Sequence, residues 1–90
     1  MNFHCFSPEN LSLLYLSPYV RITCKPRAAH FFQSMFRRSL RLDGDDKALT
    51  ELIIRLEKGA DQQELTAWGE QYFPDFAAWL SRAMLAGVIE

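Results

Sequence analysis

The second half of the chain shows the spacing of an amphipathic helix. Between Asp46 and Lys58 the apolar residues recur every three or four positions. They are Leu49, Leu52, Ile53 and Leu56. This spacing places them on one side of a helix. The acidic run Asp43-Gly44-Asp45-Asp46 suits the N-terminal end of the helix, where the helix dipole is positive. Lys58 as a cation and Gly59 as a cap suit its C-terminal end. The pattern therefore predicts a helix over Asp46 to Lys58.

Two shorter helices are predicted after Gly59. The run Asp61-Gln62-Gln63-Glu64 approximates a capping box, and Leu65 with Trp68 gives the helix that follows an inward side. Gly69 is expected to end or bend this helix. A third helix is predicted from the helical spacing of Phe76, Trp79, Leu80, Ala83 and Met84, and Gly87 is expected to stop it.

The first half of the chain shows strand patterns instead. In Tyr19 to Lys25, apolar and polar residues alternate, with Val20, Ile22 and Cys24 on one face and Arg21, Thr23 and Lys25 on the other. Lys25-Pro26-Arg27 predicts a turn. Ala29 to Met35 and Phe36 to Leu42 are two further strand candidates. Whether Gln33-Ser34-Met35 forms the turn between them is left open.

These elements predict an α+β fold: a small winged-helix-like domain with about three antiparallel strands followed by three helices. We expect this domain to cover residues 17–90. Residues 1–16 form an N-terminal segment of uncertain structure, in which Ser7 to Leu16 fits a helix start and a strand about equally well.

Composition narrows the class of protein. With 49% hydrophobic and 23% charged residues, the 90-residue chain has the composition of an ordinary globular protein. Its net charge of −1 makes nucleic acid an unexpected partner, because non-specific affinity for phosphate backbones rests on an excess of Lys and Arg. The first sixteen residues fit no secretory signal and hold no run long enough to cross a bilayer. A cytoplasmic protein without membrane association is expected.

The residue types that carry catalysis or bind metals do not form a recognisable set. Cys5 and Cys24 lack close cysteine pairs and histidines at metal spacing, and His4 and His30 complete no ligand set. The acids of Asp43-Gly44-Asp45-Asp46 lack the other oxygens of a calcium loop and are better explained as helix caps. We therefore expect no metal, no cofactor and no enzymatic activity.

Basic residues are the strongest local charge feature. Arg37, Arg38 and Arg41 lie close to Arg21, Lys25 and Arg27 in the predicted sheet. One interpretation is a solvated sheet face, and the other is a surface that attracts an acidic partner. Trp79 and Arg82 lie three residues apart in the third helix, so a groove between this helix and the last strand would pair an aromatic anchor with a cation. A role in the core is the favoured interpretation for Phe76, Leu80 and Ala83.

Several short segments resemble a known family. They are Ser17-Pro18-Tyr19-Val20-Arg21-Ile22, Arg38-Ser39-Leu40-Arg41-Leu42-Asp43-Gly44, Leu52-Ile53-Ile54-Arg55-Leu56-Glu57-Lys58-Gly59-Ala60, Glu64-Leu65, Trp79-Leu80 and Leu85-Ala86-Gly87-Val88-Ile89-Glu90. Together they resemble the peptide-recognition domains of ribosomal peptide biosynthesis (RiPP recognition elements), which are related to the peptide chaperone of pyrroloquinoline quinone synthesis. The resemblance covers about Ser17 to Glu90. The segment before Ser17 has no clear counterpart, and Arg27 to Met35 does not match a clean hairpin.

The resemblance implies a non-catalytic module that captures the leader segment of a precursor peptide and presents it to a modifying enzyme. It implies that the leader lies as an added strand beside Phe36 to Leu42 and against the helix Phe76 to Met84. The implied peptide-binding positions are Arg38, Leu40, Arg41 and Leu42 in the strand, and Phe76, Trp79, Leu80, Arg82 and Ala83 in the helix. Two alternatives stay open, namely a winged-helix DNA-associated regulator and a protein-protein adaptor. The sequence predicts no particular oligomeric state.

Overall fold

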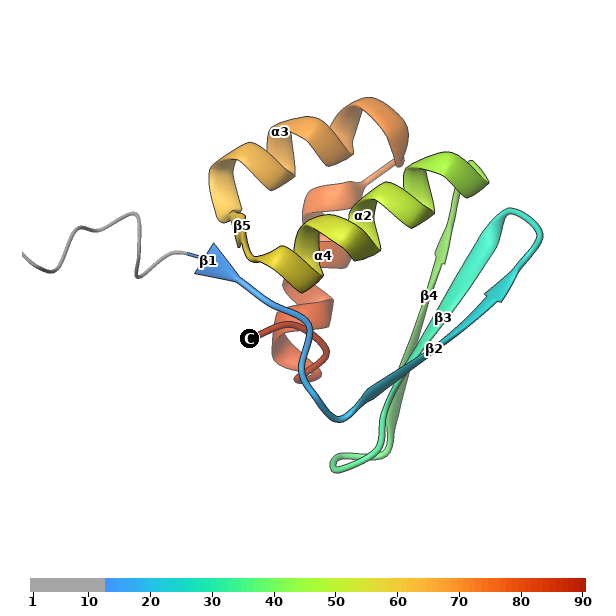
Figure 1. Ribbon diagram of the computed structural model, residues 1–90, viewed down its shortest axis with the longest axis vertical. Helices are drawn as coiled ribbons and strands as arrows, with labels where there is room; N and C mark the ends of the chain where they lie inside the picture. The colour runs from blue at the N-terminus through green and yellow to red at the C-terminus, as the bar shows by residue number, and fades with distance from the viewer. Residues whose placement is uncertain (1–12) are drawn as a thin grey trace, which may run out of the picture.

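The computed structural model describes residues 13–90 (Figure 1). Its elements are β1 (Leu13–Leu14), β2 (Val20–Lys25), β3 (Ala28–Gln33), β4 (Arg38–Asp43), α2 (Asp46–Lys58), β5 (Ala60–Asp61), α3 (Gln62–Tyr72) and α4 (Phe76–Leu85). The predicted α+β fold is confirmed: an antiparallel three-stranded sheet precedes three helices. His4, Cys5 and residues 7–12 of the ambiguous N-terminal segment lie outside the described residues.

The sheet has the order β2-β3-β4 and is built from two consecutive hairpins. Its register places Ile22, Phe31 and Leu40 side by side across the three strands. The first turn contains Pro26 followed by Arg27 with a φ of 61°. A type II turn requires a positive φ at its third residue and favours proline at its second. The turn predicted at Lys25-Pro26-Arg27 is therefore confirmed.

The second turn, whose position the sequence left open, covers residues 34–37. β3 ends at Gln33 and β4 begins at Arg38, so Met35 and Phe36 belong to the connection between the strands. The Gln33 side chain holds this turn, because its Oε1 accepts a hydrogen bond of 2.7 Å from the Met35 backbone N–H. The pattern of apolar residues cannot reveal such a contact between a side chain and the backbone. The two strands predicted from that pattern therefore extended into the turn.

α2 has the predicted bounds, and local contacts explain both of its ends. The Asp45 side chain accepts a hydrogen bond from the Lys47 N–H at 3.0 Å and caps the first turn. Gly59, at a φ of 95°, takes the chain out of the helix. In the same way, the Asp61 carboxylate accepts a hydrogen bond from the Glu64 N–H at 3.0 Å at the start of α3. The acidic caps read from the sequence are therefore present.

Gly69 does not end α3, which was one of the two roles that the sequence predicted for it. The helix continues to Tyr72, and Gly69 is buried inside it. A Cβ added at Gly69 would collide with the ring of Phe76. The glycine is there because it lets α4 approach α3 closely, and not because it breaks a helix.

The three helices lie together on one side of the sheet and enclose the core with it (Figure 1). The largest fully buried side chains are Trp79, Phe31, Phe73, Phe76, Leu52, Leu56, Leu65, Ile89 and Val88. Four of the aromatic rings form a continuous series of contacts. The ring centroids are 5.3 Å apart between Phe31 and Trp79, 5.8 Å between Trp79 and Phe76, and 5.6 Å between Phe76 and Phe73. This series links the middle of the sheet to α4 and to the end of α3.

Residues 13–17 pack on the rest of the domain. β1 pairs with β5, and Leu14 is buried in the core. The backbones of Tyr15 and Glu90 exchange two hydrogen bonds of 2.8 Å, and the Ser17 N–H donates to the Val88 carbonyl at 2.9 Å. The two ends of the described chain thus hold each other. Within residues 13–90, no helix has the length and apolar character needed to cross a membrane.

Candidate functional site

β4 lies at an edge of the three-stranded sheet. No other strand in the described part of the chain pairs with its outer side. The backbone groups along such an edge are a template for another strand. An extended peptide that adds there gains main-chain hydrogen bonds from the strand and specificity from the neighbouring side chains. This edge is the main candidate for a binding surface.

The side chains of β4 alternate between the two faces of the sheet. Leu40 and Leu42 pack toward the helices, Leu40 half-buried and Leu42 buried, and Arg38 has the same parity. Ser39 and Arg41 point to the opposite face and are exposed. Arg38 is also exposed, because it lies at the end of the strand next to the turn. The edge is therefore flanked by one arginine on each face of the sheet.

Arg41 has a local acidic partner. Its Nε lies 2.6 Å from the Asp43 Oδ1, and the two side chains are 61% and 67% exposed. An ion pair this exposed contributes little to stability and is screened by salt. A carboxylate from another molecule could therefore exchange with Asp43 at little cost. Arg38 forms no ion pair with any residue between 13 and 90.

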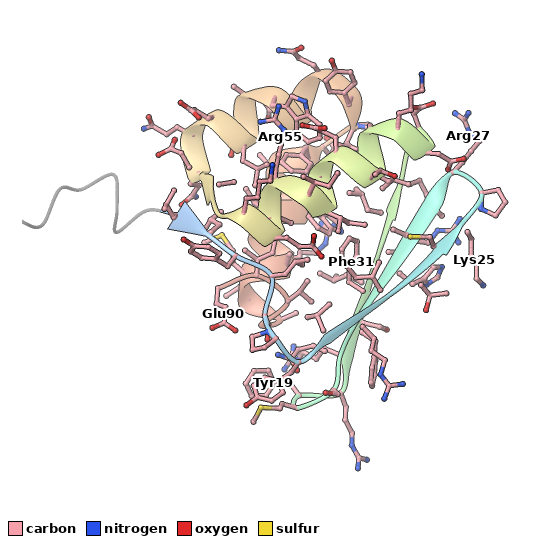
Figure 2. All side chains as sticks on the ribbon, in the orientation of Figure 1. Tyr19, Lys25, Arg27, Phe31, Arg55 and Glu90 are labelled. Carbon is pink, nitrogen blue, oxygen red and sulfur yellow. The ribbon has the colours of Figure 1, made fainter. Side chains whose placement is uncertain are left out.

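Positive charge gathers on the sheet. Residues 20–43 contain the basic residues Arg21, Lys25, Arg27, Arg37, Arg38 and Arg41 but a single acid, Asp43. All six basic side chains are exposed. Lys25 and Arg27 lie at the tip of the first hairpin, on the outside of the molecule (Figure 2). The sheet is therefore locally basic although the chain as a whole carries a charge of −1.

The candidate positions in α4 differ from those in β4. Four of them, Phe76, Trp79, Leu80 and Ala83, are at most 2% exposed. Their side chains fill the core between the helices and the sheet, which is the role that the sequence favoured for Phe76, Leu80 and Ala83. The expected surface groove with Trp79 as an aromatic anchor is therefore not formed, because Trp79 packs against Phe31. Of the helix candidates only Arg82 is exposed.

The structure thus brings Arg38, Leu40 and Arg41 together at one edge and leaves Leu42 in the core beneath them. Sequence reasoning missed the exposure of Met35 and Phe36, which are each 60% exposed in the turn before β4. The sequence does hold one indication of an apolar turn, since two large apolar residues are followed directly by two arginines.

Other kinds of site find little support within residues 13–90. No group of three or more histidine, cysteine, aspartate or glutamate side chains comes together there. Cys24 is an exposed free thiol near the tip of the first hairpin. Comparisons with models of known families, with curated proteins and with solved structures found no match. The function of this domain is therefore inferred from its own geometry.

Proposed function

We propose that this domain is a non-catalytic binding module that captures an extended acidic peptide along the outer edge of β4. The unpaired edge of that strand is the observation that carries the proposal. The peptide would add as an antiparallel strand, since antiparallel pairs are the more common kind and need no crossover within the domain.

The register of β4 translates into a preferred ligand sequence. Residues directly opposite each other in an antiparallel pair point to the same face of a sheet. Apolar residues opposite Leu42 and Leu40 would extend the covered face, and acidic residues opposite Arg41 and Arg38 would complement their charge. In the peptide's own direction, the expected pattern is apolar, acidic, apolar, any residue, acidic.

The resemblance to the peptide-recognition domains of ribosomal peptide biosynthesis supports the same role from a different starting point. On this proposal the ligand is the leader segment of a ribosomally made precursor. The domain holds the leader while a partner enzyme modifies the remainder of the precursor in the cytoplasm. The domain supplies affinity and position, and the enzyme supplies the chemistry.

A designed peptide tests the binding mode. The probe is a fluorescent peptide that contains Val-Asp-Val-Thr-Asp, and its matched partner contains Val-Lys-Val-Thr-Lys. We expect the acidic probe to shift the backbone amide resonances of Arg38–Asp43 and the lysine form to bind at least about tenfold more weakly, because like charges face each other across the added strand. An acidic probe with alternate amides methylated should not bind, since it cannot complete the ladder of hydrogen bonds.

Charge reversal in the protein supplies the control. Arg38→Glu and Arg41→Glu should each weaken the acidic probe about fivefold or more, whereas Lys58→Glu, at the C-terminal end of α2 away from β4, makes the same change in net charge and should change affinity by less than about twofold. Equal weakening by all three substitutions would reduce the effect to overall charge and contradict the proposed edge. Binding of the methylated probe would exclude strand addition.

The DNA-associated alternative receives little support from α4. The exposed residues of this helix are Ala77, Ala78, Ser81, Arg82, Met84 and Leu85. Recognition of base edges usually needs several Arg, Lys, Asn or Gln side chains on one helix, and α4 offers a single arginine. Steeply salt-dependent binding of duplex DNA would favour this alternative over the peptide-binding module.

A further inference from the structure

A groove with a volume of about 440 Å³ lies between the second turn of the sheet and the C-terminal end of α4. We call it the hairpin groove. Its lining includes Tyr19, Met35, Phe36 and Met84 at the rim and Gln33 and Gly87 in the floor. Tyr19 lies at the end of the sheet away from Lys25 and Arg27 (Figure 2).

The rim of the hairpin groove concentrates exposed apolar surface. Its side chains Tyr19, Met35, Phe36 and Met84 are 52%, 60%, 60% and 38% exposed. They are four of the nine large apolar residues exposed within residues 13–90, and Leu85, the most exposed of the nine, adjoins Met84 in the chain. Clustered exposed apolar side chains mark binding surfaces, and methionines adapt their shape to a partner. The groove therefore has the composition of a docking site.

The floor of the groove is closed by hydrogen bonds within the chain. The Gln33 side chain is 2% exposed, and its Nε2 donates to the Gly87 carbonyl at 2.9 Å and to the Ser17 Oγ at 3.3 Å. Its Oε1 accepts from the Met35 N–H, as described above. Because these groups are satisfied within the chain, the floor needs no polar contact from a ligand.

The paired backbone distinguishes this groove from the edge of β4. The Ser34 N–H donates to the Tyr19 carbonyl at 3.0 Å, and the backbone of Glu90 is paired with Tyr15. An added strand would find few free main-chain groups at these positions. A helix satisfies its own backbone and offers side chains alone, which is what an apolar groove with a closed floor accepts.

Two arginines next to the rim, outside the lining of the groove, define the partner more closely. Arg37 and Arg38 follow Phe36 directly, both are exposed, and neither forms an ion pair with another described residue. Arg37 lies in the turn with a φ of 54°. The only charged residue among the described residues of the lining is Glu90, so the acidic border of a ligand would have to lie on the side of Phe36, away from this carboxylate. Acidic residues beside the apolar stripe of a ligand would meet these two arginines.

We infer that the hairpin groove docks an amphipathic helix of a partner protein whose apolar stripe is bordered by acidic residues. This groove adjoins the proposed peptide edge and shares Arg38 with it, but its apolar lining does not depend on that edge. A module with both sites would hold an extended ligand along β4 and a folded partner at the end of the sheet.

A synthetic helix tests the inference. The probe is a capped peptide of about 18 residues, long enough for five turns, with leucines at helical spacing and glutamates along one border. We expect it to shift the amide resonances of Met35, Phe36 and Gly87 in the labelled protein. A peptide with lysine in place of glutamate should bind at least about fivefold more weakly, because it opposes Arg37 and Arg38. A scrambled peptide of the same composition, without the stripe, should not bind.

Variants of the protein separate the groove from general surface hydrophobicity. Phe36→Ser and Met84→Ser each remove an exposed rim side chain and should weaken the probe about tenfold or more. Ile54→Ser removes a similarly exposed apolar side chain from α2 and should alter affinity by less than about twofold. Equal binding of the scrambled peptide, or equal effects of the three variants, would overturn the inference. So would self-association of the wild-type protein in sedimentation that Phe36→Ser abolishes, because the occupant would then be a second copy of the chain.

Discussion

The indole of Trp79 packs against the ring of Phe31, with 5.3 Å between the ring centroids and 57° between the ring planes. This contact joins α4 to the middle strand of the sheet and fixes which side of the helix faces inward. Phe76 stacks on the same indole from one turn earlier in α4. Trp79 is thus the contact through which the sheet and the helices share one core.

Replacing Trp79 should separate packing from hydrogen bonding. Its Nε1–H is buried and has no hydrogen-bond partner among the described residues. An unsatisfied buried donor costs about 1–3 kcal/mol. Trp79→Phe removes this donor but leaves a small void, so the two effects oppose each other and we expect stability within about 1 kcal/mol of the wild type. Trp79→Ala removes the ring itself and should cost about 3–5 kcal/mol.

Urea denaturation with a probe other than tryptophan fluorescence, such as far-ultraviolet circular dichroism, measures both variants. If Trp79→Phe is as unstable as Trp79→Ala, the indole N–H must form a hydrogen bond in solution with a partner that residues 13–90 do not supply. Such a result would contradict the view that the aromatic ring alone carries the contact.

The α2 and β4 elements could be predicted because each shows its own period. The face of α2 was predicted less sharply: Leu52 and Leu56 are fully buried, whereas Ile53 is only partly buried. The spacing of three and four residues is compatible with all three positions, and the position of the sheet decides between them. Tertiary contacts therefore set the width of a helix face that the sequence only outlines.

The residues of the candidate site also fall into two groups, those whose exposure the sequence predicts and those whose burial depends on tertiary contacts. Exposure of Arg38 and Arg41 was predictable, since charged residues are rarely buried without a partner. The burial of Phe76 and Trp79 was not assigned with the same clarity, because the apolar spacing that reveals a helix also fits an apolar binding face. Likewise, the free edge of β4 depends on the order of strands in the sheet, which is a long-range property.

Asp75 sits in a conformation that favours glycine. Its φ of 55° and ψ of 36° lie in the left-handed region, and its side chain makes no capping hydrogen bond to α4. Relief of that strain in Asp75→Gly should raise the free energy of unfolding by roughly 1–2 kcal/mol. The greater conformational freedom of glycine in the unfolded chain should lower it by roughly 0.4–1 kcal/mol. The difference between the two effects lies between about 0 and about 1.6 kcal/mol, so we expect a net stabilisation of about 0.8 kcal/mol, seen in calorimetry as a rise in Tm of roughly 3–6 °C.

Asp45 provides the matched control, because it occupies the same capping position in α2 with its side chain engaged. Its carboxylate accepts from the Lys47 N–H, so Asp45→Ala should destabilise the protein by about 1 kcal/mol. The two aspartates should therefore respond with opposite signs. A fall in Tm for Asp75→Gly would mean that its carboxylate stabilises α4 in solution, for example through the helix dipole.

A substitution of Gly69 tests directly how closely α3 packs on α4. In the middle of an exposed helix, glycine to alanine stabilises by about 1 kcal/mol, because alanine has the higher helix propensity. At Gly69 the added methyl group would overlap the buried ring of Phe76, which is itself stacked between Phe73 and Trp79. The ring has no free space into which to move, so the overpacking cost of about 1–3 kcal/mol should exceed the gain in propensity. We expect Gly69→Ala to lower the free energy of unfolding in urea.

The exposed residue Ala67 in the same helix isolates the propensity term. Ala67→Gly should cost about 1 kcal/mol, so glycine and alanine differ in the ordinary direction at this position. If Gly69→Ala instead stabilised the protein, α3 and α4 would have to lie farther apart than the buried glycine indicates. The series of rings from Phe73 to Trp79 would then not be closely packed, and its contribution to the core would be smaller than its burial suggests.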